Sequence, residues 1–564
     1  MTLHYSKDLR ALGTNTNVLG VSTAADEPST SDNAPTEKQV SAQMSTRETE
    51  NENQYPSGLS LALILTSCFI CMFLTSLLMP AQDRLIITTA IPSISDEFKS
   101  VTDIAWYGSA YLLTQCASQL LFGKIYSFFS IKGTFLTSLL LFEVGSAICG
   151  AAPSSIAFIV GRAVSGLGAA GILSGIIIII VHAIPLHKRP LYQGMFGAVF
   201  GASSVTGPLL GGAFTSKVSW RWCFFINLPL GCVAAVVIFV ILKIPNSETE
   251  KLSIKAKLAQ LDFYGTGLLV PGSVSLILAL QWGGSILAWN DKRIIALLVV
   301  AGSLFFGFVL VQTFRPKTAT VPPRIFNQRS ILAGFFSTIC VSSQMTIFAY
   351  YLPIWFQAIQ GVSAVESGIR LLPLVLSMVV AMLSAGVLVR RIGYYTPVMI
   401  FGVCLMAIGA GLMYTLQVNT GSRQWIGYQI IYGLGAGSAT QAPNIAAQTV
   451  LPKRDVPIGV SLMYFGNFMS SAILLPVAQN ILNTQLLRRL SSIPGVDSET
   501  ILDNGVTSLT DLPDSVRVTV LFAYNEAIRH VFLVALVLVC LAMLGALSLE
   551  WRSTKKTDGK ETSD

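Results

Sequence analysis

The sequence has 564 residues, of which 52% are hydrophobic and only 12% are charged. A soluble domain carries about 25% charged residues, so these proportions exclude a soluble fold, a largely disordered chain and a small disulfide scaffold. The net charge of +8 fits basic loops on one side of a membrane and predicts no nucleic-acid partner, because no basic run is interleaved with aromatic residues.

Residues 1–57 are rich in Ser, Thr, Asn, Asp and Glu and show no apolar periodicity, so they are predicted to form a disordered cytoplasmic tail. Beyond them, apolar segments follow one another at the length of about 20 residues that spans a bilayer as a helix. The predicted fold class is therefore an all-α polytopic membrane protein. Fourteen transmembrane helices are predicted, at residues 59–82, 104–126, 133–152, 156–184, 191–215, 222–243, 263–282, 294–314, 331–357, 367–389, 396–416, 425–447, 457–482 and 528–549.

The distribution of basic residues predicts the orientation of these helices. Lys and Arg gather in the loops after the even-numbered segments, for example at Lys188 and Arg189 and at Arg390 and Arg391. Basic loops usually face the cytoplasm. Both termini are therefore predicted to be cytoplasmic, and the long loop 483–527 is predicted to be extracytoplasmic.

Glycine-rich motifs repeat between the two halves of the chain. The fourth segment contains R-A-V-S-G-L-G from Arg162, the twelfth contains Q-I-I-Y-G-L-G from Gln429, and each follows Gly123 or Gly386 at a similar separation. Secondary transporters are often built from duplicated halves, although glycine-rich helices can also resemble one another by chance. The predicted domains are an N-terminal six-helix bundle, a surface helix with two linker helices, a C-terminal six-helix bundle and a short cytoplasmic tail, at residues 58–243, 244–330, 331–550 and 551–564.

Three ionisable residues in apolar surroundings are predicted to serve proton coupling, because an unpaired charge inside a membrane helix is costly and usually functional. Arg162 stands in the middle of an apolar run and can hold a carboxylate partner; the alternative is a structural ion pair. Asp83 and Glu143 can bind and release a proton as their surroundings change. The alternatives are a helix-end acid beside Arg84 and a buried acid bonded to a serine or an arginine, respectively.

The fifth segment combines glycines with a proline in G-P-L-L-G-G. Gly207 and Gly211 allow a second helix to approach closely, and Pro208 removes a helical hydrogen bond and is predicted to kink the helix. The segment is predicted to pack closely and to act as a hinge or seal between two states.

Aromatic and amide side chains supply candidates for a substrate cavity. Gln115 and Gln119, for example, are four residues apart and share one helix face. Tyr and Trp in membrane proteins more often anchor a helix at the interface, which is the alternative for each aromatic residue. The predicted cavity residues are Tyr111, Gln115, Gln119, Tyr350, Trp355, Gln357, Gln441 and Asn444.

Several kinds of chemistry are not indicated. The sequence has no G-x-x-x-x-G-K-[ST] phosphate loop and no H-E-x-x-H motif, its four histidines form no ligand cluster, and its nine cysteines all lie in apolar stretches. The sequence therefore predicts no enzyme, no metal site, no ATP site and no cofactor. A proton gradient is expected to supply the driving force.

These motifs resemble those of the major facilitator superfamily, specifically the fourteen-spanning drug:proton antiporters of fungi, over about residues 58–550. D-R-L-I-I-T-T-A-I-P, with Asp83, resembles the first-helix motif, and R-A-V-S-G-L-G-A-A-G, with Arg162, resembles the fourth-helix motif associated with proton coupling. The fifth-helix antiporter motif is carried onto Gly207, Pro208, Gly211 and Gly212. Three segments are typical of the fungal branch: W-R-W-C-F-F-I-N-L-P-L-G at 220–231, A-L-Q-W-G-G at 279–284 and Y-Y-L-P-I-W-F-Q at 350–357.

One position departs from the family pattern. The loop after the second helix usually reads G-x-x-x-D-R/K-x-G, and here Ser127 replaces the acid that stabilises a closed cytoplasmic gate. Gly123 and Lys132 remain from this motif. Transport is therefore still expected, whereas this particular latch is in doubt.

The resemblance implies a monomeric efflux transporter that exchanges protons for a small organic compound, by alternating access between two six-helix bundles in a lipid bilayer. The cargo would be a toxin, a secondary metabolite or a drug. The expected location is the plasma membrane, with the vacuolar or a vesicle membrane as the alternative. Two other functions stay open: a siderophore or basic amino acid transporter of the same fold, and a transport-dead nutrient sensor.

Overall fold

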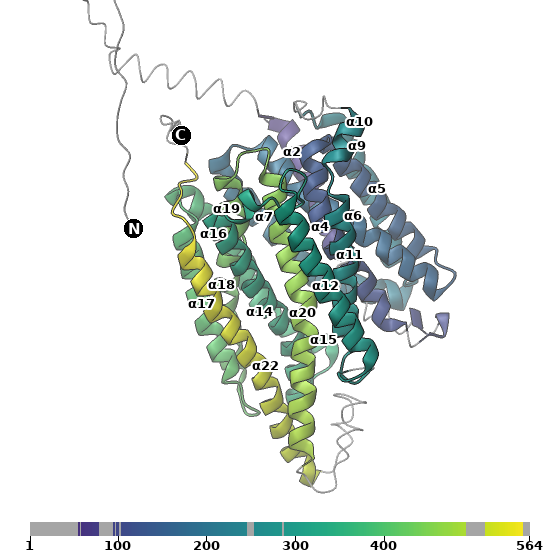
Figure 1. The fold of residues 1–564 in the computed structure, drawn as a ribbon. Helices are drawn as coiled ribbons and strands as arrows, with labels where there is room; N and C mark the ends of the chain where they lie inside the picture. The colour runs from purple at the N-terminus through teal and green to yellow at the C-terminus, as the bar shows by residue number, and fades with distance from the viewer. Residues whose placement is uncertain are drawn as a thin grey trace, which may run out of the picture. The chain divides into compact units, whose positions relative to one another are not determined.

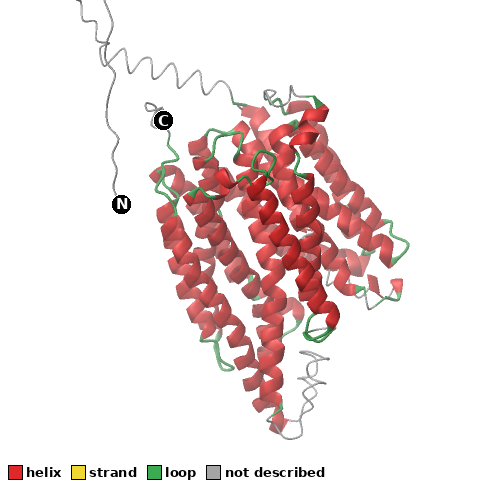
Figure 2. Cartoon of the chain, viewed as in Figure 1, coloured by secondary structure: helices red, strands yellow, loops and turns green. Residues whose placement is uncertain are grey.

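The computed structural model describes residues 55–56, 58–77, 94–95, 97–100, 103–244, 253–284, 287–491 and 514–555. Every regular element within these ranges is a helix, as Figure 2 shows. The predicted all-α fold class is therefore confirmed. Most of the predicted tail and the predicted coupling residue Asp83 lie outside the described residues.

The first half of the described chain forms one group of helices. Its members are α2 (Gly58–Leu77), α4 (Ile104–Phe128), α5 (Ile131–Gly150), α6 (Ser155–Ala183), α7 (Arg189–Lys217), α8 (Trp222–Phe225) and α9 (Asn227–Ile241). Helix α6 contacts both α4 and α5, and α2 contacts both α7 and α9. We refer to this set as the N group.

The second half forms a corresponding group, which we call the C group. Its members are α14 (Arg329–Gln360), α15 (Ala364–Ile369), α16 (Leu372–Ile392), α17 (Thr396–Tyr414), α18 (Ser422–Thr440), α19 (Ala442–Val450), α20 (Val456–Leu490) and α22 (Asp514–Ser548). Helix α18 contacts both α16 and α17, which matches the contacts of α6 in the N group. The parallel arrangement agrees with the predicted duplication.

Four helices lie between the groups in sequence, and we call them the insert: α10 (Ile254–Gln260), α11 (Phe263–Trp282), α12 (Lys292–Phe314) and α13 (Pro323–Phe326). Helix α10 occupies the place of the predicted short surface helix. Helix α11 contacts α4 and α20, whereas α12 packs beside α11 (Figure 1). Apolar side chains of α12 such as Val299 and Phe306 are exposed, as expected of a lipid-facing helix.

Eleven helices within the described ranges are long and apolar enough to cross a membrane. The three remaining predicted segments coincide with α4, α7 and α18, which are long enough but less apolar. These helices carry glycines and polar residues because they pack mainly against other helices. The described helices are thus consistent with fourteen spans.

Two helices extend well beyond their predicted ends. Helix α20 continues to Leu490 and α22 begins at Asp514, so the predicted extracytoplasmic loop 483–527 is wrong at both ends. Each helix has 35 residues and is about 50 Å long, compared with about 30 Å for the hydrocarbon core of a bilayer. Their outer turns mix charged residues with apolar ones, and Leu486, Leu490 and Val520 there are buried in the core of the C group.

The two groups meet along two helix pairs, α4 with α20 and α7 with α16. A Cβ atom on Gly123 of α4 would lie 2.8 Å from the Cβ of Ser461 on α20, and one on Gly386 of α16 would lie 2.5 Å from the carbonyl oxygen of Pro190 on α7. Gly197 and Gly201 of α7 also approach α16 closely, because a Cβ at either would overlap a side chain of α16. Glycine therefore permits the closest contacts between the groups.

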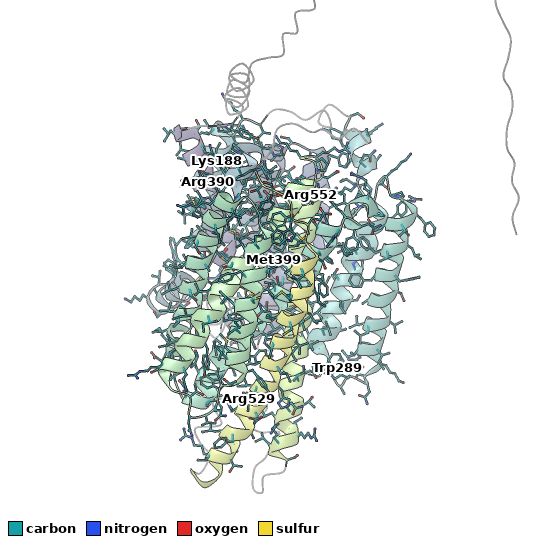
Figure 3. The ribbon with its side chains drawn as sticks, turned by 90° about the vertical axis from the view of Figure 1, so that its left-hand side faces the viewer. Lys188, Trp289, Arg390, Met399, Arg529 and Arg552 are labelled. Atoms are coloured by element: carbon teal, nitrogen blue, oxygen red, sulfur yellow. The ribbon has the colours of Figure 1, made fainter. Side chains whose placement is uncertain are left out.

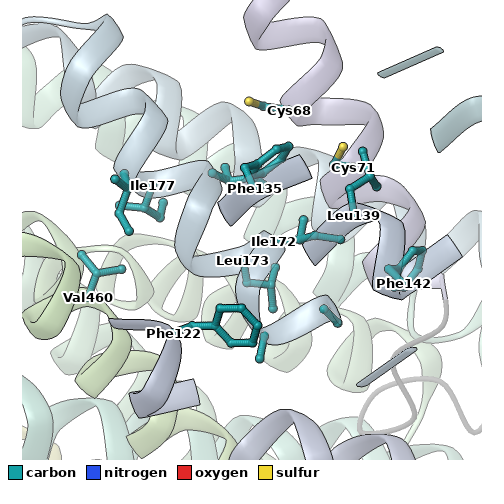
Figure 4. Packing of buried hydrophobic residues seen from close by; sticks show 14 of the residues in the cluster. Cys68, Cys71, Phe122, Phe135, Leu139, Phe142, Ile172, Leu173, Ile177 and Val460 are labelled. Carbon is teal, nitrogen blue, oxygen red and sulfur yellow. The ribbon is translucent and has the colours of Figure 1, made fainter. Parts of the chain in front are cut away.

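Helix α20 belongs to both hydrophobic cores. Its first half, including Val460, packs in the core of the N group with Cys68, Cys71 and Phe122 (Figure 4), which places these two thiols among apolar side chains. Its second half, from Ala478, packs in the core of the C group. The start of α20 thus joins the two groups, whereas its second half packs only in the core of the C group.

The basic loops lie at one end of the helices, as predicted. Figure 3 shows Lys188, Arg390 and Arg552 at this end, which we call the basic end, and Trp289 and Arg529 at the opposite end. Helices α4 and α16 end at the basic end, and α7 and α20 begin there. The close contacts of Gly123 and Gly386 therefore close the basic end.

The fungal-type segment that begins at Trp220 ties together the opposite end of the N group. The Nε1 of Trp220 donates to Glu97 at 2.7 Å, and Arg221 donates to the same carboxylate at 2.6 Å. These bonds, that of Trp220 foremost, hold the pKa of Glu97 below its usual range. Arg221 also donates to the carbonyl oxygens of Gly150 and Ala152, so this motif is structural.

Candidate functional site

A cavity of about 800 Å³ lies between the two groups. This volume is typical of sites that enclose a small organic molecule. The N group contributes Met72, Leu112, Leu173, Gly197 and Phe200 to its wall. The insert contributes residues of α11, and the C group contributes residues of α14, α16, α18, α19 and α20.

The cavity wall carries no charged side chain among the described residues. Its polar groups are hydroxyls of the C group and seven carboxamides from α11 and the C group: Gln281, Gln441, Asn444, Asn467, Gln479, Asn480 and Asn483. The N group faces them with apolar residues only. A neutral molecule with one apolar face and one face of hydrogen-bonding groups fits this asymmetry, because carboxamides both donate and accept.

Three of the eight predicted cavity residues, Tyr350, Gln441 and Asn444, lie on this wall. The other five do not line it. Trp355 donates to Asn525 of α22 at 2.7 Å, and Gln357 donates to Ser367 at 3.1 Å. Tyr111, Gln115 and Gln119 are completely buried, and the Nε2 of Gln119 donates to Ser174 of α6 at 2.6 Å. Trp355, Gln357 and Gln119 thus connect helices, whereas neither amide atom of Gln115 has a hydrogen-bond partner among the described residues.

Arg162 of α6 is completely buried and does not line the cavity. Its Nε donates to the carbonyl oxygen of Tyr107 on α4 at 2.8 Å, and its guanidinium carbon lies 4.6 Å from the ring centroid of Tyr111. The hydroxyl of Tyr111 donates to the carbonyl oxygen of Thr75 on α2 at 3.4 Å. Arg162 therefore links α6 to α4 and, through Tyr111, to α2.

Gln429 of α18 occupies the corresponding place in the C group. Its Nε2 donates to the carbonyl oxygen of Arg370 at 3.0 Å, as Arg162 donates to that of Tyr107. The glycines after the two residues also correspond: a Cβ on Gly166 would overlap α4 and one on Gly433 would overlap α16. The two motifs therefore have the same structural role in each group, and only the N group places a charge there.

Glu143 of α5 lies away from the cavity, against α9. A Cβ on Gly231 of α9 would overlap its carboxylate. Both of its oxygens are inaccessible, and neither has a hydrogen-bond partner among the described residues. The alternative of a bond to a serine or an arginine is therefore not seen in this part of the chain.

The residues of the predicted conformational motifs are dispersed. Gly207, Pro208, Gly211 and Gly212 lie within α7, which continues through the proline, and Gly212 has no neighbour within 4 Å of where its Cβ would stand. The Nζ of Lys132 lies 5.0 Å from the ring centroid of Phe239 on α9. Lys132 therefore contacts the N group and does not bridge to the C group.

A charge cluster that the sequence analysis missed joins the insert to α20 at the basic end. Arg324 of α13 donates two hydrogen bonds to Asp455, the residue before α20, at 2.6 and 2.8 Å. Lys124 of α4 is buried. Asp262 caps α11 and accepts from Gln312 and Thr320. Asp262 and Asp455 each stand directly before an apolar segment, and this position could have identified them from the sequence.

Asp455→Asn is expected to loosen the basic end, because it removes the charge that Arg324 holds. Ser461→Cys reports this opening, since Ser461 is completely buried and 3.1 Å from Ser174. We expect labelling of this cysteine by a water-soluble maleimide to become about fivefold faster, the effect of about 1 kcal/mol for a partly exposed pair.

The matched control for this prediction is Arg454→Ala. Arg454 lies 3.7 Å from the same carboxylate and is 68% exposed, so its removal should leave labelling unchanged. The reversed pair Arg324→Asp with Asp455→Arg should restore slow labelling. Equal effects of the Arg454 and Asp455 variants would contradict a specific role of Arg324.

Comparison with known proteins adds the following findings. A family model described as Major Facilitator Superfamily matches residues 64–476. An MFS-type transporter of Claviceps purpurea is 52% identical over 89% of this chain and 86% of the relative. A rubrofusarin-specific efflux pump of Gibberella zeae is 46% identical over 90% of this chain and 92% of the relative, and an efflux pump of Penicillium rubens is 44% identical over 90% and 93%.

Solved structures show the same fold at low sequence identity. The human organic anion transporter MFSD10 superposes with a TM-score of 0.53 at 13% identity, over 86% of this chain and all of the other. A bacterial homologue of the iron transporter ferroportin, in an outward-facing state, gives 0.53 at 12% identity, over 86% of this chain and 98% of the other.

Proposed function

The chain belongs to the major facilitator superfamily, and from this premise we propose that it is a proton-coupled antiporter that exports small, neutral organic compounds by alternating access. The observation that carries the proposal is the cavity between the two groups. Its wall combines apolar residues on one side with carboxamides and hydroxyl groups on the other and, within the described part of the chain, has no charged side chain.

Export of a metabolite or toxin is supported by the relatives. A rubrofusarin-specific efflux pump, an efflux pump of Penicillium rubens and an MFS-type efflux pump of Trichophyton rubrum share 44 to 47% of their aligned residues with this chain. Each is similar over at least 88% of this chain. We propose a cargo of the same general kind, a neutral secondary metabolite or a drug of similar chemistry.

The proposed setting is the plasma membrane, with both termini in the cytoplasm and the protein acting as a monomer. The basic end would then face the cytoplasm. Because the close contacts of Gly123 and Gly386 lie at this end, the structure would represent the state closed to the cytoplasm. Alternating access requires these contacts to separate in the other state.

Transport of a basic amino acid is less well supported, because a cationic cargo needs a carboxylate partner and none lines the cavity in the described residues. A siderophore of neutral overall charge would fit the same wall. A nutrient sensor of this fold would bind its ligand without moving it. Measuring transport separates these functions.

The proposal is tested with inside-out membrane vesicles that contain the protein and are supplied with rubrofusarin. We expect uptake into vesicles whose lumen is acidified, because protons leaving the lumen would drive the cargo inward. A proton ionophore should abolish the uptake, and vesicles without the protein should show none. Binding without uptake would favour the sensor, and uptake that ignores the pH gradient would rule out antiport.

A further inference from the structure

The inserted helix α11 reaches the cavity. Ile277, Leu280 and Gln281, together with Gly283 and Gly284 directly after the helix, form part of the cavity wall. Helix α11 contacts α4 of the N group and α20 of the C group, so it lies beside the opening between the groups. The insert is therefore more than a connection between two bundles.

A pair of hydrogen bonds fixes the end of α11 against α20. The Nε1 of Trp289 donates to Oδ1 of Asn480 at 2.8 Å, and the Nδ2 of Asn480 donates to the carbonyl oxygen of Gly283 at 3.3 Å. We call these two bonds the clasp. Asn480 also lines the cavity, so the clasp lies at its edge.

The two glycines of A-L-Q-W-G-G are required by this clasp. Gly284 has a φ of +73°, which favours glycine, and a Cβ there would overlap the Asn480 amide. A Cβ on Gly283 would lie 2.8 Å from the Trp289 ring. Larger residues at either position would push Trp289 away from Asn480, so the motif serves the attachment of α11 to α20.

We propose that α11 forms a specificity-determining wall of the substrate cavity, with Gln281 as the residue that contacts the cargo and the Trp289–Asn480 clasp as the element that positions it. This inference rests on the proposed function. Gln281 would complete the set of carboxamides on α20 formed by Gln479, Asn480 and Asn483. A carboxamide pairs with carbonyl and hydroxyl groups of a neutral cargo, so Gln281 would favour oxygenated aromatic compounds over hydrocarbons.

The placement of Gln281 is tested without transport, by cysteine labelling. The background carries alanine at the exposed Cys232, Cys404 and Cys540. In this background, Gln281→Cys should react with a charged methanethiosulfonate at least about tenfold faster than Val299→Cys, because Val299 lies on the lipid-facing helix α12. Equal rates would overturn the placement of α11 on the cavity wall.

The role of Gln281 is tested by export from yeast cells loaded with Nile red, a neutral aromatic dye with a carbonyl group, or with diphenylhexatriene, a hydrocarbon. Gln281→Leu should raise the KM for Nile red about three- to tenfold, as expected for one lost hydrogen bond, and leave that for diphenylhexatriene unchanged. The same change at Gln424, which is exposed and outside the cavity, should have no effect.

Trp289→Phe tests the clasp, because it keeps the ring and removes only the donor. We expect an increase in the KM for Nile red of about threefold with an unchanged maximal rate. No change in KM would overturn the positioning role, and equal losses for both dyes with Gln281→Leu would overturn its role in specificity. If position 281 is labelled rapidly but the protein exports neither dye, the proposed function is rejected. The selectivity assigned to Gln281 is then rejected as well, and only the placement of α11 on the cavity wall is retained.

Discussion

Arg162→Ala is expected to abolish export while the protein remains in the membrane. Arg162 is completely buried, and its side chain joins α6 to the Tyr107 carbonyl and the Tyr111 ring of α4. Alanine removes the only charge that the repeated R/Q-x-x-x-G-L-G motif carries. We expect cargo uptake into acidified inside-out vesicles to fall at least about tenfold, a change of about 1.4 kcal/mol in the barrier.

The matched control is Gln429→Ala, because Gln429 makes the corresponding bond to a carbonyl oxygen in the C group. This variant should retain most of its export, since no charge is lost. Arg162→Lys keeps the charge but loses the planar stacking on Tyr111, and we expect intermediate export. Each variant is checked for expression and for a single peak in size-exclusion chromatography.

Two results would contradict the coupling role of Arg162. Normal export by a folded Arg162→Ala protein would show that the charge is dispensable. Equal loss in the Gln429→Ala protein would show that the motif acts through helix packing alone, because both side chains hold the same position in their groups.

Glu143→Gln is expected to uncouple export from the proton gradient. The Glu143 carboxylate lies against Gly231 and is inaccessible, without a hydrogen-bond partner in the described part of the chain. Glutamine has nearly the same shape but cannot exchange a proton. We expect cargo to equilibrate across vesicle membranes at a rate similar to that of the wild type, and the stimulation by an acidic lumen to disappear.

Glu366→Gln is the matched control for this change. Glu366 is 45% exposed at the opposite end and pairs with Arg370, and such surface pairs contribute little. Its loss should leave the gradient dependence intact. Gly231→Ala offers a second variant, since a methyl group there would displace the Glu143 carboxylate without changing its charge, and it should weaken coupling. Full gradient dependence in Glu143→Gln would assign the proton to another acid, such as Asp83.

The sequence predicted the positions of the helices well, because hydrophobic length is the dominant signal in a membrane protein. It failed at the outer turns of α20 and α22, where charged residues such as Arg488 and Arg517 interrupt the apolar run although residues such as Val520 remain in the core of the C group. The motifs at Arg162 and Gln429 were recognised from their shared G-L-G residues and their spacing, and their equivalent contacts follow from shared helix geometry.

The cavity was harder to predict. Gln115 and Gln119 share a face, but Gln119 meets α6 on that face, and helical spacing cannot tell a neighbouring helix from a cavity. Asn483 follows Asn480 by three residues and Gln479 by four on α20, a pattern that could have been noticed. The contribution of α11 to the cavity wall could not have been predicted, because the insert lies outside both repeats.

The division of α20 between the two cores has a consequence for biosynthesis. The ribosome finishes α9 roughly 200 residues before it reaches α20, yet Val460 and its neighbours complete the core of the N group. When a core is completed by a helix far along the sequence, folding is slower, and apolar surfaces stay uncovered until that helix has been made. During synthesis, lipid or an insertion factor must therefore cover the face of α4 and α6 that α20 later occupies.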